Sequence, residues 1–486
     1  MTVMKMKMLN IIPYPKKVIT NDSKAADINS AAFEFIEDSS ISPESFRIEY
    51  DCKEVKICYS DESGKFYALQ TIAQLKRSGK VPAFTIEDCP IYSYRGFSLD
   101  CARHSFKIPD IKKLIDAAAL FRLNRFHWHL TDDQGWRIEM SSHKRLNKIS
   151  SVRKKSAFGG VIDEHEYRAL FTKEEIKEIV EYCKERHIEV IPEIDMPGHA
   201  SAILAAYPEL GCSKKPVEVQ TKQGIYKNIL CVSNENVYSF VYDILDEICE
   251  LFPYEYIHIG GDETPTKSWE ECPNCRKMKE ELGLKDFNAL QSVFTKRIAD
   301  YLKSKGRKAI VWNESLKGGM PKADSVCVQH WMGGGNSSFE YAEKGGENNR
   351  IRLFPLLLRL SVRNDTAGKK HIISAPRRNI RTARQKSLFG IEAEMWTEYV
   401  RDFDTLCYRY FPRIAAIAET AWGYKTSYKD FTERFKAIEP ILNENGIKPA
   451  PIKDRDLNPL LRVPDIIKFF SGSLNPKALK DHMDVK

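Results

Sequence analysis

Two adjacent acids, Asp262 and Glu263, stand immediately after a pair of glycines. Residues 256–259, just before them, have the β-branched and aromatic content of a buried strand, so the acids are predicted to lie where a strand ends. Successive strand residues point to opposite faces, so both acids can enter one pocket only if the glycines let the backbone leave the pleat. Two carboxyls in a dry pocket have pKa values that are pushed apart, leaving one ionised and one protonated near neutral pH. The pair is predicted to be an acid and an orienting base, with a solvated acidic loop as the alternative.

A regular alternation of strands and helices begins near Tyr94 and would position these acids. Apolar runs of strand length are predicted at residues 96–101, 125–130, 189–194, 256–259, 309–313, 326–331 and 390–396. Helical patterns are predicted between them at residues 108–123, 173–187, 237–252, 289–304 and 406–422. This α/β series predicts a (β/α)8 TIM barrel, with one strand unaccounted for between Trp331 and Gly390.

The chain divides into three predicted parts. Residues 1–92 mix short strands with an amphipathic helix, which predicts a small α+β domain. Residues 93–450 hold the barrel, and residues 451–486 are predicted to form a C-terminal tail. Within the barrel, residues 348–386 form an anomalous segment in which the seventh strand is predicted to be disrupted.

Chemistry in such barrels collects at the carboxyl ends of the strands. The predicted strand ends carry acids, histidines, tryptophans and other polar residues, namely Asp100, Arg103, His104, His127, His129, Asp132, Asp133, Glu193, Asp195, His199, Trp312, Asn313, Glu314, His330, Trp331, Glu394, Trp396 and Glu398. Indoles stack on the apolar faces of sugar rings while charged groups hydrogen-bond the hydroxyls, so this rim predicts a carbohydrate pocket. The two residues His127 and His129 could instead serve core packing or, less often, metal binding.

The composition suits a globular protein with a sizeable core. The 486 residues with 42% hydrophobic content fit about two domains. No stretch reaches the roughly 20 apolar residues of a membrane span, so no membrane partner is expected. The first residues include Lys5 and Lys7 but meet Pro13 before any apolar run forms, which predicts no signal peptide and a cytoplasmic protein.

The formal net charge of +8 arises in one segment. Residues 348–386 contain eleven lysines or arginines and one acid, Asp365, an excess of ten that leaves the rest of the chain at about −2. The segment has no tyrosine or tryptophan to stack on bases, and no nucleic-acid motif is recognisable. A nucleic-acid partner is therefore not expected.

The 12 cysteines show no disulfide framework, and most fall in apolar runs, which is typical of buried, reduced thiols. One close pair, Cys272 and Cys275, forms a CxxC motif that could suit zinc or redox chemistry. No second CxxC and no histidine lies nearby in the sequence, which favours a structural pair at a helix start. The sequence therefore predicts no metal site and no cofactor.

A set of motifs together resembles glycoside hydrolase family 20, the exo-acting β-N-acetylhexosaminidases. They are residues 94–97 (YRGF) with Asp100, 128–137 (WHLTDDQGWR), 192–199 (PEIDMPGH), 258–263 (HIGGDE), 312–314 (WNE) and 396–398 (WTE). The resemblance extends in the family's order from about residue 10 to residue 425. It implies hydrolysis of terminal β-linked N-acetylglucosamine or N-acetylgalactosamine from an amino-sugar oligosaccharide or glycan.

In that family the substrate's own 2-acetamido oxygen is the nucleophile, and configuration is retained through an oxazolinium-type intermediate. The resemblance makes Glu263 the general acid and then the base that activates water, and Asp262 the acceptor of the acetamido N–H. Arg95 and Glu398 match positions that hydrogen-bond the hydroxyls of the terminal sugar. The remaining matches are aromatic walls and a supporting acid–histidine pair, namely Trp312, Trp331, Trp396, and His199 with Asp132 or Asp133.

One feature of the family is missing. Its members have a tyrosine at the seventh strand whose hydroxyl holds the acetamido carbonyl, yet no tyrosine occurs from Ala342 to Glu398. We hypothesise that residues 348 to about 384 are out of frame with the rest of the gene. The alternative is a true insertion with the tyrosine supplied elsewhere. The alternative function is accordingly a catalytically impaired or inactive relic that at most binds amino sugars.

Overall fold

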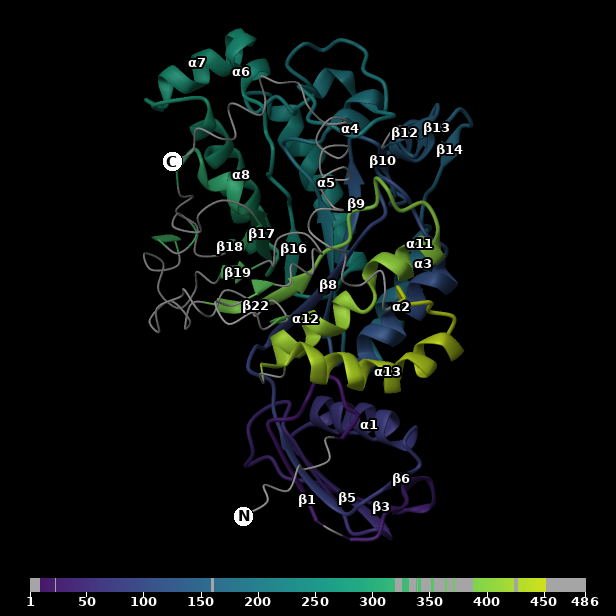
Figure 1. Ribbon diagram of the computed structural model, residues 1–486. Coiled ribbons are helices and arrows are strands. Elements are labelled where there is room, and N and C mark those ends of the chain that lie inside the picture. Colours follow the sequence, from purple (N-terminus) through teal and green to yellow (C-terminus); the bar gives the residue numbers. More distant parts are fainter. Residues whose placement is uncertain are drawn as a thin grey trace.

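The computed structural model describes residues 9–451, except for residues 22, 159–160, 320–325, 332–337, 339, 342–350, 354–362, 365–369, 372–387 and 424–426. The chain forms a five-stranded sheet near its N-terminus and a barrel of parallel strands surrounded by helices. In Figure 1 the barrel stands above the N-terminal sheet.

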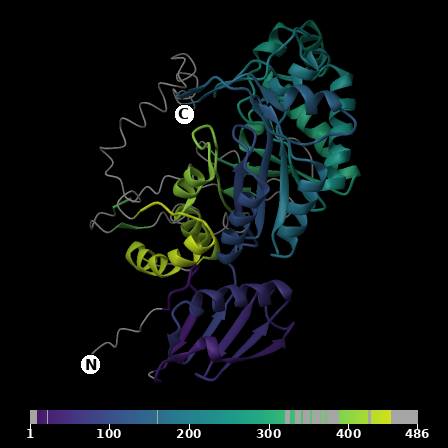
Figure 2. The same cartoon turned by 90° about the vertical axis from the view of Figure 1, so that its right-hand side faces the viewer.

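The strands of the N-terminal domain lie side by side in the order β1, β7, β4, β5 and β3. Their bounds are Lys17–Thr20 for β1, Phe84–Asp88 for β7, Phe46–Tyr50 for β4, Glu54–Tyr59 for β5 and Ala32–Glu37 for β3. Side chains of β4, β5 and β7 alternate between buried and more exposed positions, which gives the sheet an apolar face. Helix α1 (Glu62–Lys76) packs on that face, between the sheet and the barrel (Figure 2). A short strand pair, β2 (Ala26–Asp27) and β6 (Lys80–Val81), and the turn η1 (Ile28–Ser30) complete the α+β domain.

Eight parallel strands close the barrel, because β8 pairs with both β9 and β22. In order around the barrel they are β8 (Tyr94–Asp100), β9 (Arg125–Asp132), β15 (Glu189–Ile194), β16 (Tyr256–His258), β17 (Lys308–Trp312), β18 (Val326–His330), β19 (Ile351–Leu353) and β22 (Leu388–Ala393). Every residue of β8 is buried, as expected for a strand covered on both faces. The predicted (β/α)8 barrel preceded by a small domain is confirmed.

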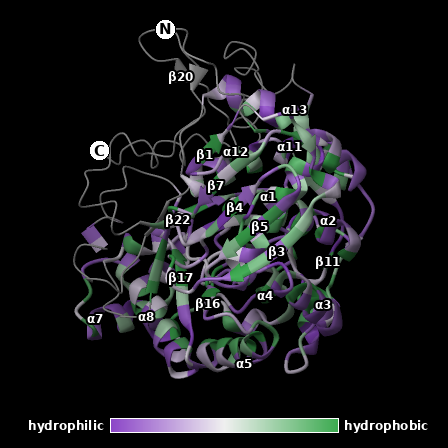
Figure 3. Cartoon of the chain, turned by 90° about the horizontal axis from the view of Figure 1, so that it is seen from below, coloured by the Kyte–Doolittle hydropathy of each residue, from purple (hydrophilic) through white to green (hydrophobic). Residues whose placement is uncertain are grey.

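The helices around the barrel bury one apolar face each. They are α2 (Ile108–Leu120), α3 (Lys173–Lys184), α5 (Glu235–Leu251), α8 (Asn288–Ser304), α11 (Phe403–Tyr410), α12 (Arg413–Trp422) and α13 (Tyr428–Glu444). In α3 the buried residues Ile176, Ile179 and Cys183 recur at helical spacing, and Thr172 with Glu175 closes the N-terminus as a capping box. Seen from the N-terminal sheet, helices α3, α5 and α8 lie on the outside of the strands (Figure 3).

Short elements are inserted after the carboxyl ends of several strands, at the end of the barrel away from the N-terminal domain (Figure 1). They are β10 (Gly135–Trp136), the π-helix η2 (Leu146–Ser150), β11 (Val152–Arg153), β12 (Ser156–Phe158), β13 (Val161–Asp163), β14 (Tyr167–Arg168), α4 (Ser201–Ala206), η3 (Pro208–Leu210), α6 (Lys267–Glu271), α7 (Pro273–Glu281) and η4 (Asn313–Leu316). The strand pair β20 (Arg363–Asn364) and β21 (Lys370–His371) forms a two-stranded sheet of its own. The insertions surround the rim on which the predicted site residues lie.

Buried ion pairs join the N-terminal domain to the end of the barrel where the strands begin. Arg95, at the start of β8, pairs with Glu44 at 2.8 Å, and Arg122 pairs with Asp88 at 2.7 Å. The Trp422 indole also donates a hydrogen bond to Asp88, at 2.8 Å. These contacts fix the N-terminal domain against the amino ends of the barrel strands.

The C-terminal half of the chain departs from the predicted elements in two places. The seventh strand is present as β19, although it has only three residues, and the rest of the anomalous segment 348–386 lies largely outside the described residues. The predicted helix 406–422 is two helices, because Pro412 lies between α11 and α12 and cannot donate a helical hydrogen bond. The predicted tail falls outside the described residues except for Pro451. Among the described helices, none is long and apolar enough to cross a membrane.

Candidate active site

The backbone leaves the pleat directly after β16, as the glycine pair predicted. Gly260 and Gly261 have φ angles of 66° and 95°. A Cβ at Gly260 would lie 1.7 Å from Asp195 Oδ1, and one at Gly261 would lie 2.1 Å from Ser315 Oγ. Both positions therefore require glycine for space as well as for conformation. Glu263 itself has a φ of 42°, which is a strained left-handed conformation for a residue with a side chain.

The two acids face one histidine. His199 Nε2 lies 3.7 Å from Asp262 Oδ2 and 3.7 Å from Glu263 Oε2. The other nitrogen, Nδ1, lies 3.0 Å from Asp133 Oδ2 and 3.3 Å from Asp132 Oδ1. His199 therefore links Asp262 and Glu263 to a second pair of acids. The sequence analysis expected one of that second pair, Asp132 or Asp133, to support His199, and both lie next to it.

Burial sets the protonation of the acid pair. It raises the pKa of Asp262 to about 6, with the charges of Glu193 and Glu314 adding to the rise and His199 opposing it. Burial also raises the pKa of Glu263 to about 7, again with His199 opposing the rise. The two carboxyls titrate as an interacting pair in which Glu263 keeps its proton to the higher pH. The predicted split between an ionised and a protonated acid has this physical basis.

The acids around His199 favour its protonated form. Burial alone would lower the pKa of His199, but the charges of Asp132 and Asp262 raise it well above the ordinary value. Burial likewise opposes ionisation of Asp132, but the positive charges of Arg103 and His199 hold the pKa of that carboxyl far below its usual range. Asp132 and His199 are thus a buried ion pair beside the reacting acids.

Arg103 is the cation at the centre of the rim. Its guanidinium lies 2.5 Å from Asp132 and 3.5 Å from Asp100. The guanidinium carbon stands 5.2 Å from the ring centre of Trp396, and the negative charge of Glu398 helps to raise the pKa of Arg103. Planar donors of this kind suit the paired oxygens of sugar hydroxyls.

Three tryptophans form one wall of the site. The ring centre of Trp312 lies 5.9 Å from that of Trp396 and 6.4 Å from that of Trp331. Trp312 is held in place by its indole N–H, which donates to Glu193 Oε1 at 2.7 Å. The three rings provide apolar faces of the size of a pyranose ring or an acetyl methyl group.

Several buried polar atoms in the described part of this rim have no hydrogen-bond partner. They include Asp262 Oδ1, His199 Nε2, Trp331 Nε1 and Glu394 Oε1. Buried polar atoms are almost always hydrogen-bonded, because leaving one unpaired costs about 1–3 kcal/mol. A group of such atoms around two acids therefore indicates that a polar ligand completes the site.

His127 and His129 belong to a buried hydrogen-bond network inside the barrel. Glu193 accepts hydrogen bonds from His129 Nδ1, from His127 Nε2 at 3.0 Å and from the Trp312 indole. The side-chain nitrogen and oxygen atoms of His127, Glu193 and His258 are close enough together to hold a metal ion. However, His127 Nε2 and Glu193 Oε2 are already hydrogen-bonded to each other. The structure favours a packed hydrogen-bond network here over metal binding.

Glu314 and Asp195 hold the loop of the acids, and the sequence had given neither a specific role. Glu314 Oε2 accepts a hydrogen bond from the Glu263 N–H at 3.1 Å. Asp195 Oδ1 accepts one from the Gly261 N–H at 3.0 Å. Their position at the ends of β17 and β15 was the available signal, because both strands were predicted.

Arg95 is the one predicted site residue that the structure places elsewhere. It is fully buried at the amino end of β8, where it contacts Glu44, the Tyr67 hydroxyl and the carbonyl oxygens of Tyr92 and Arg122. The substrate-binding role expected of Arg95 is therefore not supported. Arg103, three residues beyond the opposite end of the same strand, lies at the rim and contacts Asp132 and Trp396. The other predicted residues meet at one rim, namely Asp262, Glu263, Asp132, His199, Trp312, Trp331, Trp396 and Glu398.

Comparison with known proteins agrees with this geometry. Curated relatives include a "Beta-hexosaminidase" of Porphyromonas gingivalis, 34% identical over 428 residues that cover 83% of this chain and 54% of the relative. Another, a "Beta-hexosaminidase" of Akkermansia muciniphila, is 31% identical over 85% of this chain and 86% of the relative. This chain thus spans about half the length of the first relative and most of the second.

Solved structures show the same likeness. One described as "crystal structure of a beta-N-acetylhexosaminidase" has a TM-score of 0.81 and 28% identity, covering 90% of this chain and 96% of that one. A beta-N-acetylhexosaminidase from Bacteroides fragilis has a TM-score of 0.77 and 29% identity, covering 92% and 99%.

Two family descriptions match almost the whole described chain. "Glycosyl hydrolase family 20, domain 2" matches residues 14–89. "Glycosyl hydrolase family 20, catalytic domain" matches residues 92–349 and 361–425, with an interruption inside the basic segment. The acid pair, the barrel and these matches lead to one conclusion: the chain belongs to glycosyl hydrolase family 20.

Proposed function

We propose that this protein hydrolyses terminal, non-reducing β-linked N-acetylglucosamine or N-acetylgalactosamine residues of oligosaccharides or glycans. The observation that carries the proposal is the buried pair of Asp262 and Glu263, whose raised pKa values leave one carboxyl ionised and the other protonated close to neutral pH. Three tryptophans beside the pair fit a sugar ring that bears an acetamido group.

Glu263 is the proton donor in this proposal. Its proton passes to the glycosidic oxygen as the C1–O bond breaks, and the aglycone leaves as an alcohol. Ionised Glu263 then takes a proton from water, which attacks C1 and restores the resting state. The Glu314 contact to the Glu263 N–H holds the loop in place through both steps.

Asp262 orients the nucleophile, which belongs to the substrate. The unpartnered Oδ1 of Asp262 accepts the acetamido N–H, and this places the acetamido oxygen for attack on C1. The positive charge on the resulting oxazolinium-type ring lies next to the Asp262 carboxylate, which stabilises it. Attack by water on C1 opens that ring, regenerates the acetamido group and retains the configuration.

The remaining rim residues hold the terminal sugar. Arg103, Asp132 and Glu398 supply donors and acceptors for the ring hydroxyls, and Arg103 stands over Trp396. Binding through several charged hydrogen bonds is typical of an exo-acting enzyme, because the non-reducing end must be held in a closed pocket.

The first experiment compares two chromogenic substrates that differ only at C2. The 4-nitrophenyl β-glycoside of N-acetylglucosamine should be hydrolysed, whereas the 4-nitrophenyl β-glucoside should not, because it lacks the acetamido nucleophile. Asp262→Asn should lose most of the activity on the first substrate and keep its thermal unfolding temperature.

Two other results would contradict the proposal. Equal rates on both substrates would show that the acetamido group is not the nucleophile. A folded wild-type protein that binds N-acetylglucosamine without turnover would instead support the inactive relic, which the absence of tyrosine from Ala342 to Glu398 suggested.

A further inference from the structure

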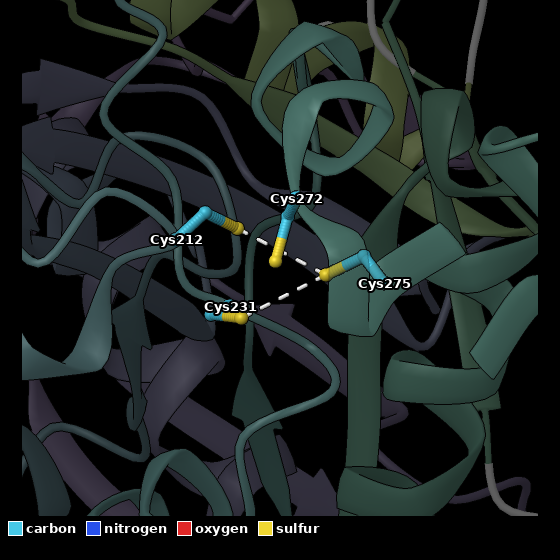
Figure 4. A group of neighbouring side chains, drawn as sticks. All are labelled: Cys212, Cys231, Cys272 and Cys275. Atoms are coloured by element: carbon cyan, nitrogen blue, oxygen red, sulfur yellow. Dashed lines mark hydrogen bonds between the residues drawn. The ribbon is translucent and has the colours of Figure 1, made fainter. Parts of the chain in front are cut away.

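Four cysteines from distant parts of the chain meet beside the barrel rim. Cys212, Cys231, Cys272 and Cys275 direct their sulfur atoms toward a common centre (Figure 4). Their sulfurs all lie within 4.8 Å of one another, and all but Cys212 are buried. The sequence showed only the CxxC pair, because the other two cysteines precede it by about 40 and 60 residues and share no local motif with it.

The spacing of the sulfurs matches a four-thiolate metal site. Cys231 Sγ lies 3.7 Å from Cys275 Sγ, and Cys212 Sγ lies 3.9 Å from it. Tetrahedral ligands at a Zn–S distance of about 2.3 Å are about 3.8 Å apart. A disulfide would need about 2.05 Å between two sulfurs. The distances between the sulfur atoms are therefore those of a zinc site and not those of a disulfide.

Local structure presents each pair of thiols. An isolated antiparallel bridge joins Gly211 to Leu230, and so brings together the two chain segments that carry Cys212 and Cys231. The Cys231 N–H donates to the Leu210 carbonyl at 2.9 Å and reinforces this bridge. Backbone pairing thus holds together two cysteines that are 19 residues apart in the sequence.

The other pair stands at the start of a helix. Cys272 is the N-cap of α7, and Cys275 lies in its first turn. Partial positive charge at a helix N-terminus favours thiolates over thiols. Ser233 Oγ lies 3.2 Å from Cys275 Sγ and 3.4 Å from Cys231 Sγ, so its hydroxyl can donate to a charged sulfur. Hydrogen bonds of this kind orient the ligands of metal sites.

We propose that Cys212, Cys231, Cys272 and Cys275 together bind one Zn²⁺ ion as a tetrahedral structural site. The four thiols give up their protons to solvent as the ion binds, and no electron is transferred. All four positions around the metal are filled by protein, so the site has no place for a substrate or a reactive water.

The ion would tie together the two loops that carry the catalytic rim. Cys212 and Cys231 belong to the connection after β15, and Leu230 of that connection donates its N–H to the Pro197 carbonyl, two residues before His199. Cys272 and Cys275 belong to the connection after β16, just beyond Glu263. The Trp269 indole already links the two connections by donating to the Leu230 carbonyl at 2.9 Å. The metal would be a second, stronger link at the same place.

The test is the metal content of the intact protein, which does not depend on whether the proposed hydrolysis is correct. We expect about one zinc per molecule, measured by inductively coupled plasma mass spectrometry, in protein that is produced with zinc present and purified under reducing conditions. Apoprotein reconstituted with Co²⁺ should show the thiolate-to-cobalt absorption of a tetrahedral site. Removing zinc with a chelator should lower the unfolding temperature by roughly 5 °C or more, because the ion binds only the folded state.

Variants assign the ligands. Cys275→Ser and Cys212→Ser should each lose most of the bound zinc, and Cys212 is the gentler change because it is the least buried of the four. Cys183→Ser is the matched control, since Cys183 is a fully buried cysteine of α3 outside the cluster, and it should keep the metal.

Four results would overturn the proposal. One is a wild-type protein that takes up neither zinc nor cobalt. Another is iron in the same position, which would show a different metal centre. A third is a disulfide between two of these four cysteines, found by peptide mapping of protein purified without a reductant. The last is a Cys212→Ser protein that holds as much zinc as the wild type.

Discussion

One arginine lies near each end of strand β8, Arg95 within the strand and Arg103 three residues beyond it, and their surroundings differ. Arg95, at the amino end, is fully buried, and both of its terminal nitrogens are within hydrogen-bond distance of Glu44. Arg103, at the carboxyl end, lies among more acids than it can neutralise, including Asp100 and Asp132. The first environment is complete without a ligand, and the second is not.

The difference shows how one fold separates stability from function. At the amino end, every hydrogen bond of Arg95 goes to a fixed partner, so its contribution is to join two domains. At the carboxyl end, Asp262 Oδ1 and His199 Nε2 are buried without a hydrogen-bond partner in the described structure. Unpaired buried groups cost stability, and they persist where a substrate repays that cost on binding.

The largest expected effect is at the carboxyl end. Glu263→Gln should lower kcat on a substrate with a sugar leaving group by about 10³-fold, because the general acid is lost. The loss should be smaller on a 4-nitrophenyl glycoside, whose leaving group needs less protonation. Steady-state kinetics on both substrates measure the ratio. Asp262→Asn is the control, since it should slow both substrates to a similar extent. Equal losses on both substrates for Glu263→Gln would contradict its role as the acid.

Replacing Arg95 and Arg103 in turn by lysine tests the comparison directly. Arg95→Lys should lower the free energy of unfolding by about 2–3 kcal/mol and leave kcat/KM nearly unchanged, because lysine cannot replace a paired guanidinium. Urea unfolding and kinetics on the same preparation measure the two quantities.

At the other end, Arg103→Lys should lower kcat/KM by roughly 10- to 100-fold with a smaller loss of stability, since the lost contacts include those to the sugar hydroxyls. The contrast between the ends would be wrong if the two variants showed the same ratio of kinetic to stability effects.

A smaller effect concerns pH. Asp262 must be ionised, so kcat/KM should rise with pH through about 6, and Glu263 must be protonated, so it should fall as pH passes about 7. His199→Gln removes the positive charge that holds both pKa values down, so both limbs should move to higher pH by about one unit. A profile that stays in place would show that His199 does not act through its charge.

The smallest effect is expected on the surface. Lys154 and Glu218 form an ion pair at 2.5 Å, but both side chains are more than 70% exposed. Lys154→Met should change the free energy of unfolding by less than about 0.5 kcal/mol, in contrast to Arg95→Lys. A large loss in urea unfolding would mean that burial is not what distinguishes these ion pairs.

Much of the barrel could be predicted from the sequence because its strands and helices have clear apolar patterns. Strand β15 was predicted with its observed bounds, and α3 and α8 were placed within a few residues. The helix pair α11 and α12 was predicted as one, because the apolar pattern continues on both sides of Pro412.

The site residues that directly follow strands could be predicted from the sequence. Those whose role depends on contacts between distant segments could not. The acid pair and the tryptophans lie at strand ends, which the sequence pattern marks. Arg95 was given a substrate-binding role from the family resemblance, because its partner Glu44 belongs to another domain and only the folded chain shows their contact. The cysteine cluster was missed for the same reason, since Cys212 and Cys231 are far from the CxxC motif in sequence.

The crowding around Gly260 and Gly261 has a consequence for how this chain can vary. A methyl group at either position would overlap Asp195 or Ser315. Gly283 also has a positive φ, of 60°, but a Cβ there would meet nothing within 4 Å. A library with every substitution at these positions should therefore return active clones with asparagine at residue 283 and only glycine at residues 260 and 261. Sequences that keep this loop are therefore expected to keep both glycines before Asp262 and Glu263, because no other residue fits at either position.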